Sequence, residues 1–362
     1  MLRRLTFVAA GLVVALAITE GALRLTRSAT EMNGYRQPEI PQEAARWVDH
    51  PFLPYAGRPG AEYLVHGHDG MEEVEAVVRN NALGFRTAEF PETKSEGAFH
   101  IVILGGSTTW GALAKTNADT WPGLLETRLR ARYPEREIRV FSLAAQNATA
   151  AYSAVALALV GSTLEPDLVL AYHGHNDVSP AIGVGFRADQ AHHFQNLALD
   201  RRWFGVQSSL PRFLLRSYAV TFLSAGLDGF LGANRLAWYV ERRYPFDIRA
   251  PLDADLFAER FARNSRHLLS IDALARGLGG RALFSTFQFL EQKFPFTHVN
   301  FALRKFYEEQ GLDYVDLDHL IEDEDRSLQF DQCHFTAKGR ELVADHFFDA
   351  IVERGLIDAS AR

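Results

Sequence analysis

The feature that most constrains the fold is the stretch His100–Gly111, in which a short apolar run ends abruptly in two glycines and a serine. The run Ile101–Leu104 has the composition of a buried parallel strand, and the glycines after it indicate a tight turn. In an open α/β sheet such turns form the rim of the ligand crevice, where Gly105 and Gly106 let the backbone pass close to a substrate. We therefore expect Ser107 to present its hydroxyl at this rim. An isolated Gly-Gly-Ser also fits a serine that only caps the next helix, so distant parts of the chain must decide.

Composition narrows the function classes. The chain has 362 residues, 47% of them hydrophobic and 23% charged, which is typical of a globular protein with a full core. A net charge of −7 argues against a nucleic-acid-binding protein, which normally presents a basic face. The only cysteine, Cys333, excludes an intrachain disulfide and a cysteine-based zinc site. No metal or organic cofactor is implied.

Residues 1–27 differ from the rest of the chain. Arg3 and Arg4 precede an uncharged run from Leu5 to Thr19, and small residues stand at Ala15-Leu16-Ala17. This pattern fits a secretory signal, and it also fits a short membrane anchor, which we favour. Glu20 can pair with Arg24 one helical turn on. Both interpretations place the rest of the chain outside the cytoplasm, in the periplasm or the extracellular space.

Residues 28–98 are polar and rich in turns, and we interpret them as a tether followed by a wrap onto the main domain. His66 and His68 lack a third ligand nearby, so a surface strand or loop is favoured over a metal site. The segment Asn81–Arg86 resembles a specific turn with an anchoring Phe85 and an arginine that reaches inward.

The chain after residue 99 alternates between strand-like and helix-like segments. Thr120 or Asp119 can cap a helix that has Pro122 in its first turn. Further strands are expected at 138–143, 166–172, 281–288 and 314–317, and further helices at 148–164, 254–276, 298–310 and 336–354. Such alternation predicts a parallel sheet with helices on both faces. Residues 178–250 interrupt it with many aromatic residues and arginines, and we interpret them as an inserted lid, part of whose surface can touch lipid.

Two distant motifs support a catalytic role for Ser107. Asp331 stands three residues before His334, a spacing that can hold a carboxylate against one imidazole nitrogen and leave the other to accept a serine proton. The sequence Gly174–Asp177 follows a predicted strand, so Asn176 is expected on the same rim, where its amide can donate to a developing oxyanion. Each motif alone also fits an ordinary turn or surface pair.

Together the three motifs resemble those of the SGNH (GDSL-like) hydrolase superfamily, in the G-G-S-T-T form of a membrane-anchored subgroup. The resemblance covers about residues 99–355 apart from the lid: Gly105–Gly111 matches the first block, Gly174–Asp177 the third and Asp331–His334 the last. The subgroup also tends to carry an N-x-x-G-F-R segment, as at Asn81–Arg86. The resemblance implies a flavodoxin-like three-layer α/β/α sandwich with a five-stranded parallel sheet and an inserted lid. The α/β-hydrolase alternative fits less well, because its nucleophile motif G-x-S-x-G would require a glycine at Thr109.

One block departs from the family pattern. The resemblance places Asn147 where the family has a glycine that donates its backbone N–H to the oxyanion. Donation from the backbone does not require glycine, and asparagine tolerates the left-handed conformation better than most residues. The expected oxyanion hole is therefore formed by the N–H groups of Ser107 and Asn147 and by the side chain of Asn176.

The function implied is hydrolysis of a carboxylic ester, with the acyl group on a small molecule, a cell-envelope glycan or a lipid. Ser107 would be the nucleophile, His334 the general base and then acid, and Asp331 its orienting partner. Two alternatives remain at this point. The same residues could transfer an acyl group to an envelope polysaccharide, or the chain could be an inactive envelope-binding or scaffolding protein.

Overall fold

The computed structural model describes residues 2–26, 46–48, 50, 52–68, 72–183, 186–190, 193, 217–220, 222–223, 253–289, 294–320 and 327–358. The chain divides into two units, one of residues 1–47 and 196–245, the other of residues 48–195 and 246–362. Most of the expected lid lies outside the described residues. Its first residues, 178–182, continue a helix of the larger unit.

The smaller unit contains helix α1 (Leu2–Thr26) and the short segment around Ser217. The expected pair forms, with Arg24 Nε 2.6 Å from a Glu20 carboxylate oxygen. The other Glu20 oxygen accepts hydrogen bonds from the Ser217 hydroxyl at 2.7 Å and the Ala219 N–H at 2.8 Å. No described helix, α1 included, has the length and apolar character needed to cross a membrane.

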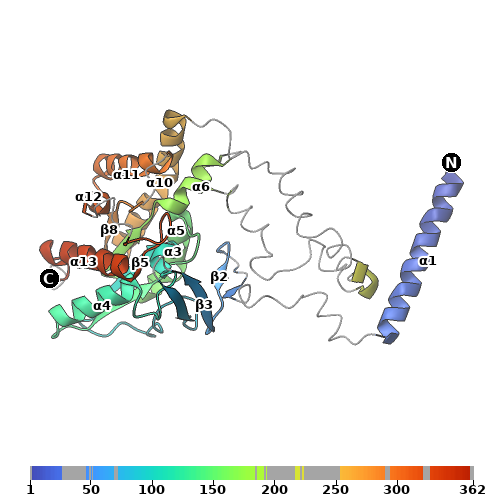
Figure 1. Cartoon of the computed structure of the whole chain (residues 1–362), viewed down its shortest axis with the longest axis horizontal. Coiled ribbons are helices and arrows are strands. Elements are labelled where there is room, and N and C mark those ends of the chain that lie inside the picture. Colours follow the sequence, from blue (N-terminus) through green and yellow to red (C-terminus); the bar gives the residue numbers. More distant parts are fainter. Residues whose placement is uncertain are drawn as a thin grey trace. The chain divides into compact units, whose positions relative to one another are not determined.

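The larger unit is built on a five-stranded parallel sheet, with strand order β6-β5-β7-β8-β9. Figure 1 labels β5 and β8 of this sheet among the helices that surround it. In chain order this is 2-1-3-4-5, the flavodoxin-like arrangement, and it confirms the fold predicted from the sequence. The strands are β5 (Phe99–Gly105), β6 (Ile138–Ser142), β7 (Leu168–Tyr172), β8 (Arg281–Ser285) and β9 (Tyr314–Val315). Every residue of β5 and β7 is buried, because both strands have sheet neighbours on each side and helices on each face.

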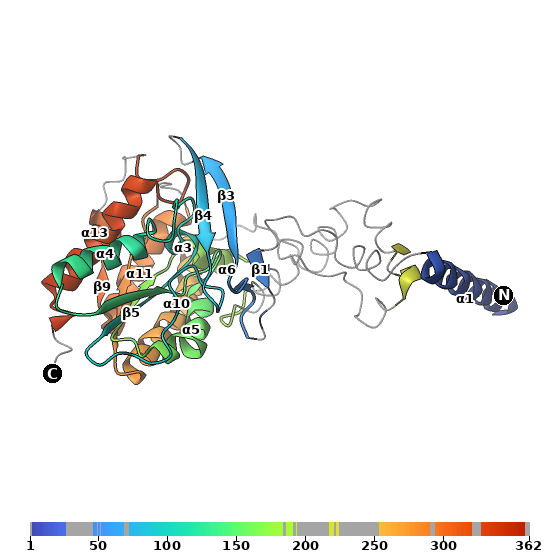
Figure 2. The ribbon, with the colours of Figure 1, turned by 90° about the horizontal axis from the view of Figure 1, so that it is seen from below.

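Helices cover the two faces of this sheet. Helix α4 (Trp121–Arg132) packs against α13 (Ala337–Glu353) on one face (Figure 2). Helices α5 (Ala150–Leu159), α10 (Ala254–Gly277) and α11 (Phe296–Gln310) cover the other face, where α10 contacts both α5 and α11. This is the arrangement that right-handed crossovers produce. Short helices complete the layers: α3 (Ser107–Trp110), the 3₁₀ helix η2 (Gly161–Leu164), α6 (His175–Ile182) and α12 (Leu317–Leu320).

Local sequence explains the helix starts. Thr120, one of the two expected caps, accepts a hydrogen bond from the Gly123 N–H, and Pro122 lies in the first turn of α4. The expected helix 148–164 is divided, because α5 ends at Leu159 and η2 follows. The strand expected at 281–288 ends at Ser285.

The segment before β5 is an ordered part of this unit. After a two-stranded pairing of β1 (Trp47–Val48) with β2 (Ala56–Gly57), it forms an antiparallel hairpin of β3 (Glu62–His68) and β4 (Glu73–Arg79). His66 and His68 are exposed on β3, as expected for a surface strand. We call residues 52–98 the wrap.

Candidate active site

Ser107 begins helix α3 directly after strand β5, at the carboxyl edge of the sheet. Both preceding glycines are required by close contacts. A Cβ on Gly105 would lie 2.1 Å from Thr109 Oγ1, and one on Gly106 would lie 2.3 Å from Asn176 Nδ2. The alternative in which Ser107 only caps a helix does not fit, because the residue at the cap position is Gly106.

His334 approaches Ser107 from the loop before α13. Its Nε2 atom lies 2.7 Å from Ser107 Oγ, and its Nδ1 atom lies 2.7 Å from Asp331 Oδ2. The structure thus brings together the serine, histidine and aspartate that the sequence predicts. Thr108 links the two loops, since its hydroxyl donates to the Cys333 carbonyl at 3.3 Å.

The spacing of Asp331 and His334 is explained by a local turn. Asp331 Oδ1 accepts hydrogen bonds from the N–H groups of Cys333 at 2.9 Å and His334 at 2.8 Å, which leaves Oδ2 for the imidazole. Partial burial alone would raise the pKa of the Asp331 carboxyl, but these hydrogen bonds and the one to His334 outweigh it and lower the pKa to about 2. Asp331 is therefore ionised at neutral pH and holds the Nδ1–H tautomer of His334.

The predicted oxyanion donors lie on the ends of three neighbouring strands. Ser107 follows β5, Asn147 follows β6 and Asn176 follows β7. Asn147 has φ = +58°, the left-handed conformation for which asparagine is suited. The N–H groups of Ser107 and Asn147 make no hydrogen bond within the described part of the chain. Asn176 Nδ2 donates one of its two hydrogens to the Ala148 carbonyl at 3.0 Å, which leaves the other for a ligand.

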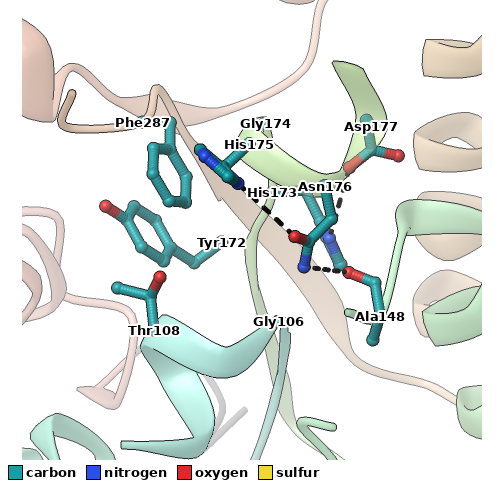
Figure 3. A pocket seen from close by; sticks show the side chains of 10 residues that line it. All are labelled: Gly106, Thr108, Ala148, Tyr172, His173, Gly174, His175, Asn176, Asp177 and Phe287. Atoms are coloured by element: carbon teal, nitrogen blue, oxygen red, sulfur yellow. Dashed lines mark hydrogen bonds and ion pairs between the residues drawn. The ribbon is translucent and has the colours of Figure 1, made fainter. Parts of the chain in front are cut away.

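A small pocket adjoins these donors and has an aromatic wall (Figure 3). Asn176 and Gly106 lie on one side of it, and the rings of His175 and Phe287 lie on the other. The His175 ring stacks on Phe296 with centroids 5.2 Å apart and planes 7° apart. Burial lowers the pKa of His175, which favours its neutral form beside the site. The pocket therefore places aromatic ring surface next to the hydrogen-bond donors.

The residues that line the pocket include a buried pair, His173 and Asp177, that we did not predict from the sequence. His173 Nδ1 and Asp177 Oδ2 are 3.7 Å apart, and both residues are at most 5% exposed. Burial lowers the pKa of His173 to about 3 and raises that of Asp177 to about 7. Asp177 Oδ1 accepts from the Ala150 N–H at 2.9 Å, so it fixes the start of α5 just after Asn147. Asp177 belongs to a recognised motif, but its pairing depends on a contact that local sequence does not reveal.

One group among the described residues has the ligand atoms for a metal, namely Asp331, Cys333 and His334. These atoms already have other roles. A metal bound to Nδ1 would displace the Asp331–His334 hydrogen bond, and burial raises the pKa of the Cys333 thiol, which opposes the thiolate that metals prefer. The geometry fits proton transfer rather than metal binding.

These residues all lie in a part of the chain that matches a known family. The family model described as "GDSL-like Lipase/Acylhydrolase family" matches residues 103–342, more than half of the chain. The chain belongs to this family. It is an ester hydrolase of the SGNH type, which the first, third and last motifs already suggested.

Comparison with solved structures shows similarity at low sequence identity. An α/β hydrolase, LAE5, from the metagenome of Lake Arreo is 17% identical, with a TM-score of 0.40, and covers 72% of this chain and 97% of its own. The acetyl xylan esterase AlAXEase is 14% identical, with a TM-score of 0.40 over 70% of this chain and 100% of its own. A lipase/acylhydrolase from Enterococcus faecalis is 15% identical, with a TM-score of 0.41, and the match covers 71% of this chain and 96% of that protein. No curated protein matched significantly.

Proposed function

We propose that the protein hydrolyses a carboxylic ester through an acyl-serine intermediate formed on Ser107. The observation that carries this proposal is the continuous hydrogen-bonded chain from Ser107 Oγ through His334 to Asp331, with 2.7 Å at each step. A serine hydroxyl is a weak nucleophile at neutral pH, and a hydrogen-bonded imidazole with a fixed tautomer activates it.

The first half-reaction forms the acyl-enzyme. As Ser107 Oγ bonds to the acyl carbon, its proton passes to His334 Nε2 and the carbonyl oxygen becomes an oxyanion. The C–O bond to the alcohol then breaks, and the alcohol leaves with the proton from His334. The second half-reaction repeats these steps with water, which loses a proton to His334, attacks the acyl carbon and releases the carboxylic acid. Asp331 remains ionised and stabilises the imidazolium in both halves.

Three donors would stabilise the oxyanion in this scheme: the backbone N–H groups of Ser107 and Asn147 and the side-chain amide of Asn176. Two observations support this assignment. The two N–H groups make no hydrogen bond within the described residues, and the Asn176 amide has a second hydrogen beside the one donated to Ala148. Donors held in place before the charge appears lower the transition-state energy without a reorganisation cost.

We further propose that the ester is carried by a cell-envelope glycan or lipid, and that residues 1–27 direct the hydrolase out of the cytoplasm or anchor it to the membrane. Support comes from the two arginines before the apolar run and from the small residues at Ala15-Leu16-Ala17.

Covalent labelling tests the reaction class. A fluorophosphonate reacts with an activated serine, so the wild type should be labelled and Ser107→Ala should not. Ser162→Ala, which removes a hydroxyl on the surface helix η2, is the matched control and should label like the wild type. A panel of esters of increasing acyl length then defines the substrate. Equal labelling of wild type and Ser107→Ala, or no ester turnover by a labelled enzyme, would contradict the proposal.

A further inference from the structure

Arg86, in the wrap, holds the loop that follows the nucleophile. The Arg86 guanidinium donates to the carbonyls of Trp110 at 3.3 Å, Gly111 at 2.6 Å and Ala114 at 2.8 Å, and its Nε donates to Asn117 Oδ1 at 3.1 Å. The same guanidinium lies 4.9 Å from the centre of the Trp110 ring. Within the described residues its hydrogen-bond acceptors are therefore all uncharged.

Burying the Arg86 guanidinium costs free energy, which its contacts with the loop must offset. Arg86 is only 3% exposed, and burial lowers its pKa to about 10, so the side chain still carries its charge at neutral pH. A buried charge with uncharged acceptors loses its hydration, and only a full set of hydrogen bonds offsets that loss. Two of the acceptors, the carbonyls of Trp110 and Gly111, end the turn that Ser107 begins, and the Gly111 N–H donates to the Ser107 carbonyl at 2.9 Å. Arg86 thus holds the carboxyl-terminal end of that turn and the loop that follows it through one side chain.

The local sequence places Arg86 rigidly. Asn81 Oδ1 accepts from the N–H groups of Leu83 and Phe85, each at 3.0 Å, which closes the turn. Gly84 has φ = +89°, and a Cβ there would lie 2.0 Å from the Gly57 carbonyl oxygen. The Phe85 ring is buried in the main core. The backbone next to Arg86 is therefore held in place, and the Arg86 side chain extends from a defined position.

A second contact of the wrap reaches the turn that carries Asn147. The hydroxyl of Tyr55, a residue only 2% exposed, donates to the carbonyl of Gln146. The Tyr55 ring stacks on Tyr152 with centroids 5.3 Å apart, and the Tyr152 hydroxyl donates to the Tyr55 carbonyl at 3.2 Å. The neighbour of the expected oxyanion donor is thus held from the wrap side.

A third contact reaches His334. Val74 and Ala76 of β4 form a buried cluster with Leu113, and Phe330 packs against this cluster. The Phe330 ring in turn stacks on the His334 ring with centroids 5.7 Å apart and planes 13° apart. The hairpin therefore supports the general base through one intervening side chain.

We propose that the wrap is a clasp that positions the nucleophile, the oxyanion turn and the general base together, and that Arg86 is its main positioning residue. The family match begins at residue 103, so all clasp residues that reach these loops precede it. The inference rests on the proposed function for its kinetic test. Its structural test, amide exchange, does not depend on activity.

The kinetic test compares Arg86→Ala and Arg86→Lys with Arg79→Ala. Arg79 is an exposed arginine of strand β4, also in the wrap. Its side chain pairs with Glu62, so its loss should leave activity unchanged. Displacing a catalytic group by about 1 Å can cost roughly 10²-fold in rate, so we expect Arg86→Ala to lower kcat by roughly 10- to 100-fold, with KM changed only a few-fold. Lysine cannot reproduce the guanidinium geometry and should restore little.

Two further readouts separate positioning from general destabilisation. Millimolar guanidinium should restore part of kcat to Arg86→Ala and nothing to Arg86→Met, whose side chain fills the site. Amide exchange of Ser107–Ala114 should accelerate in Arg86→Ala, whereas the core of β7 should stay protected. Should Arg86→Ala fail to fold, Tyr55→Phe is the second variant. It removes only the hydrogen bond to Gln146, and we expect kcat to fall with the melting temperature nearly unchanged.

The outcomes distinguish the two proposals. Normal kcat and normal exchange in Arg86→Ala and Tyr55→Phe would overturn the clasp and leave the esterase proposal intact. A kcat loss that follows the melting temperature, with no guanidinium rescue, would assign the clasp to stability alone and also overturn it. Wild-type protein without fluorophosphonate labelling would refute the proposed function, while amide exchange still decides whether Arg86 orders the loop.

Discussion

Ser107 and His334 are 227 positions apart in the sequence, yet Ser107 Oγ lies 2.7 Å from His334 Nε2. Two local features produce this contact. The glycine turn after β5 puts the serine at the sheet edge, and the Asp331 turn before α13 points the imidazole back toward it. A proton can therefore move from the hydroxyl to the ring with no rearrangement of the chain.

The first prediction concerns this contact. Ser107→Ala and His334→Ala should each lower kcat by roughly 10⁴-fold or more, and the double variant should be little worse, because the two groups act as one unit. Steady-state rates on an ester that the wild type cleaves provide the measurement. Additive losses, or full activity in either variant, would exclude the mechanism.

The second prediction concerns Asp331. Asp331→Asn keeps the shape of the side chain but can stabilise the wrong imidazole tautomer and cannot balance the imidazolium charge. We expect a loss in kcat of roughly 10⁴-fold, as for a comparable triad aspartate, with the melting temperature nearly preserved. In the wild type, the pKa of about 2 means that Asp331 stays ionised throughout the mildly acidic range. Any activity loss that begins near pH 4 must then come from the protonation of another group.

The third prediction concerns the buried carboxyl of Asp177. Its pKa rises from 3.8 to about 7 on folding because burial disfavours the charge. Between these values the unfolded chain has released a proton that the native state retains, so the free energy of unfolding falls as pH rises. Asp177→Asn retains an acceptor for the Ala150 N–H but cannot ionise.

Urea denaturation at pH 4.5 and at pH 7 tests this sign. As pH rises, the wild type should lose unfolding free energy because of its Asp177 carboxyl, and Asp177→Asn should not. The stability of the variant relative to the wild type should therefore increase by up to a few kcal/mol between the two pH values. Because the other titratable groups are shared, the comparison isolates Asp177. A difference that stays constant with pH would show that the carboxyl ionises equally in both states.

The fourth prediction concerns location. The full chain should fractionate with membranes, and a chain that starts at Thr30 should be soluble. Intact-mass analysis of the exported protein decides between anchor and signal, since a mature chain starting at Ile18 would show cleavage. Recovery of the untruncated protein in the cytoplasm would contradict both interpretations.

The contact of Ser107, His334 and Asp331 could be predicted from the sequence because each residue is placed by a short-range pattern. A buried strand followed by Gly-Gly-Ser places Ser107, and a three-residue spacing places Asp331 against His334. The His173–Asp177 pair and the acceptors of Arg86 were not predictable in the same way. The residues of the first pair are only four positions apart, but their burial is set by packing in the folded chain. The second set joins residues that are 24 to 31 positions apart. An inward arginine was expected at residue 86, but three of its four acceptors are backbone carbonyls, which have no sequence signature.

The last prediction separates two oxyanion donors of different kinds. Asn147 would donate through its backbone and has φ = +58°, a conformation that glycine adopts freely and β-branched residues avoid. Asn147→Gly should therefore retain most activity, whereas Asn147→Val should distort the turn and lower activity.

Asn176 would donate through its side chain, so Asn176→Ala removes the donor and also the hydrogen bond to the Ala148 carbonyl. Loss of one such donor typically costs ~2.7–4 kcal/mol in the transition state, or roughly 10²–10³ in kcat. KM should change little, because the oxyanion forms only after attack. Steady-state kinetics on folded variants should thus rank Asn176→Ala far below Asn147→Gly in kcat. The reverse ranking would mean that the Asn147 side chain itself binds substrate or anchors the turn, and the oxyanion hole would have to be assigned again.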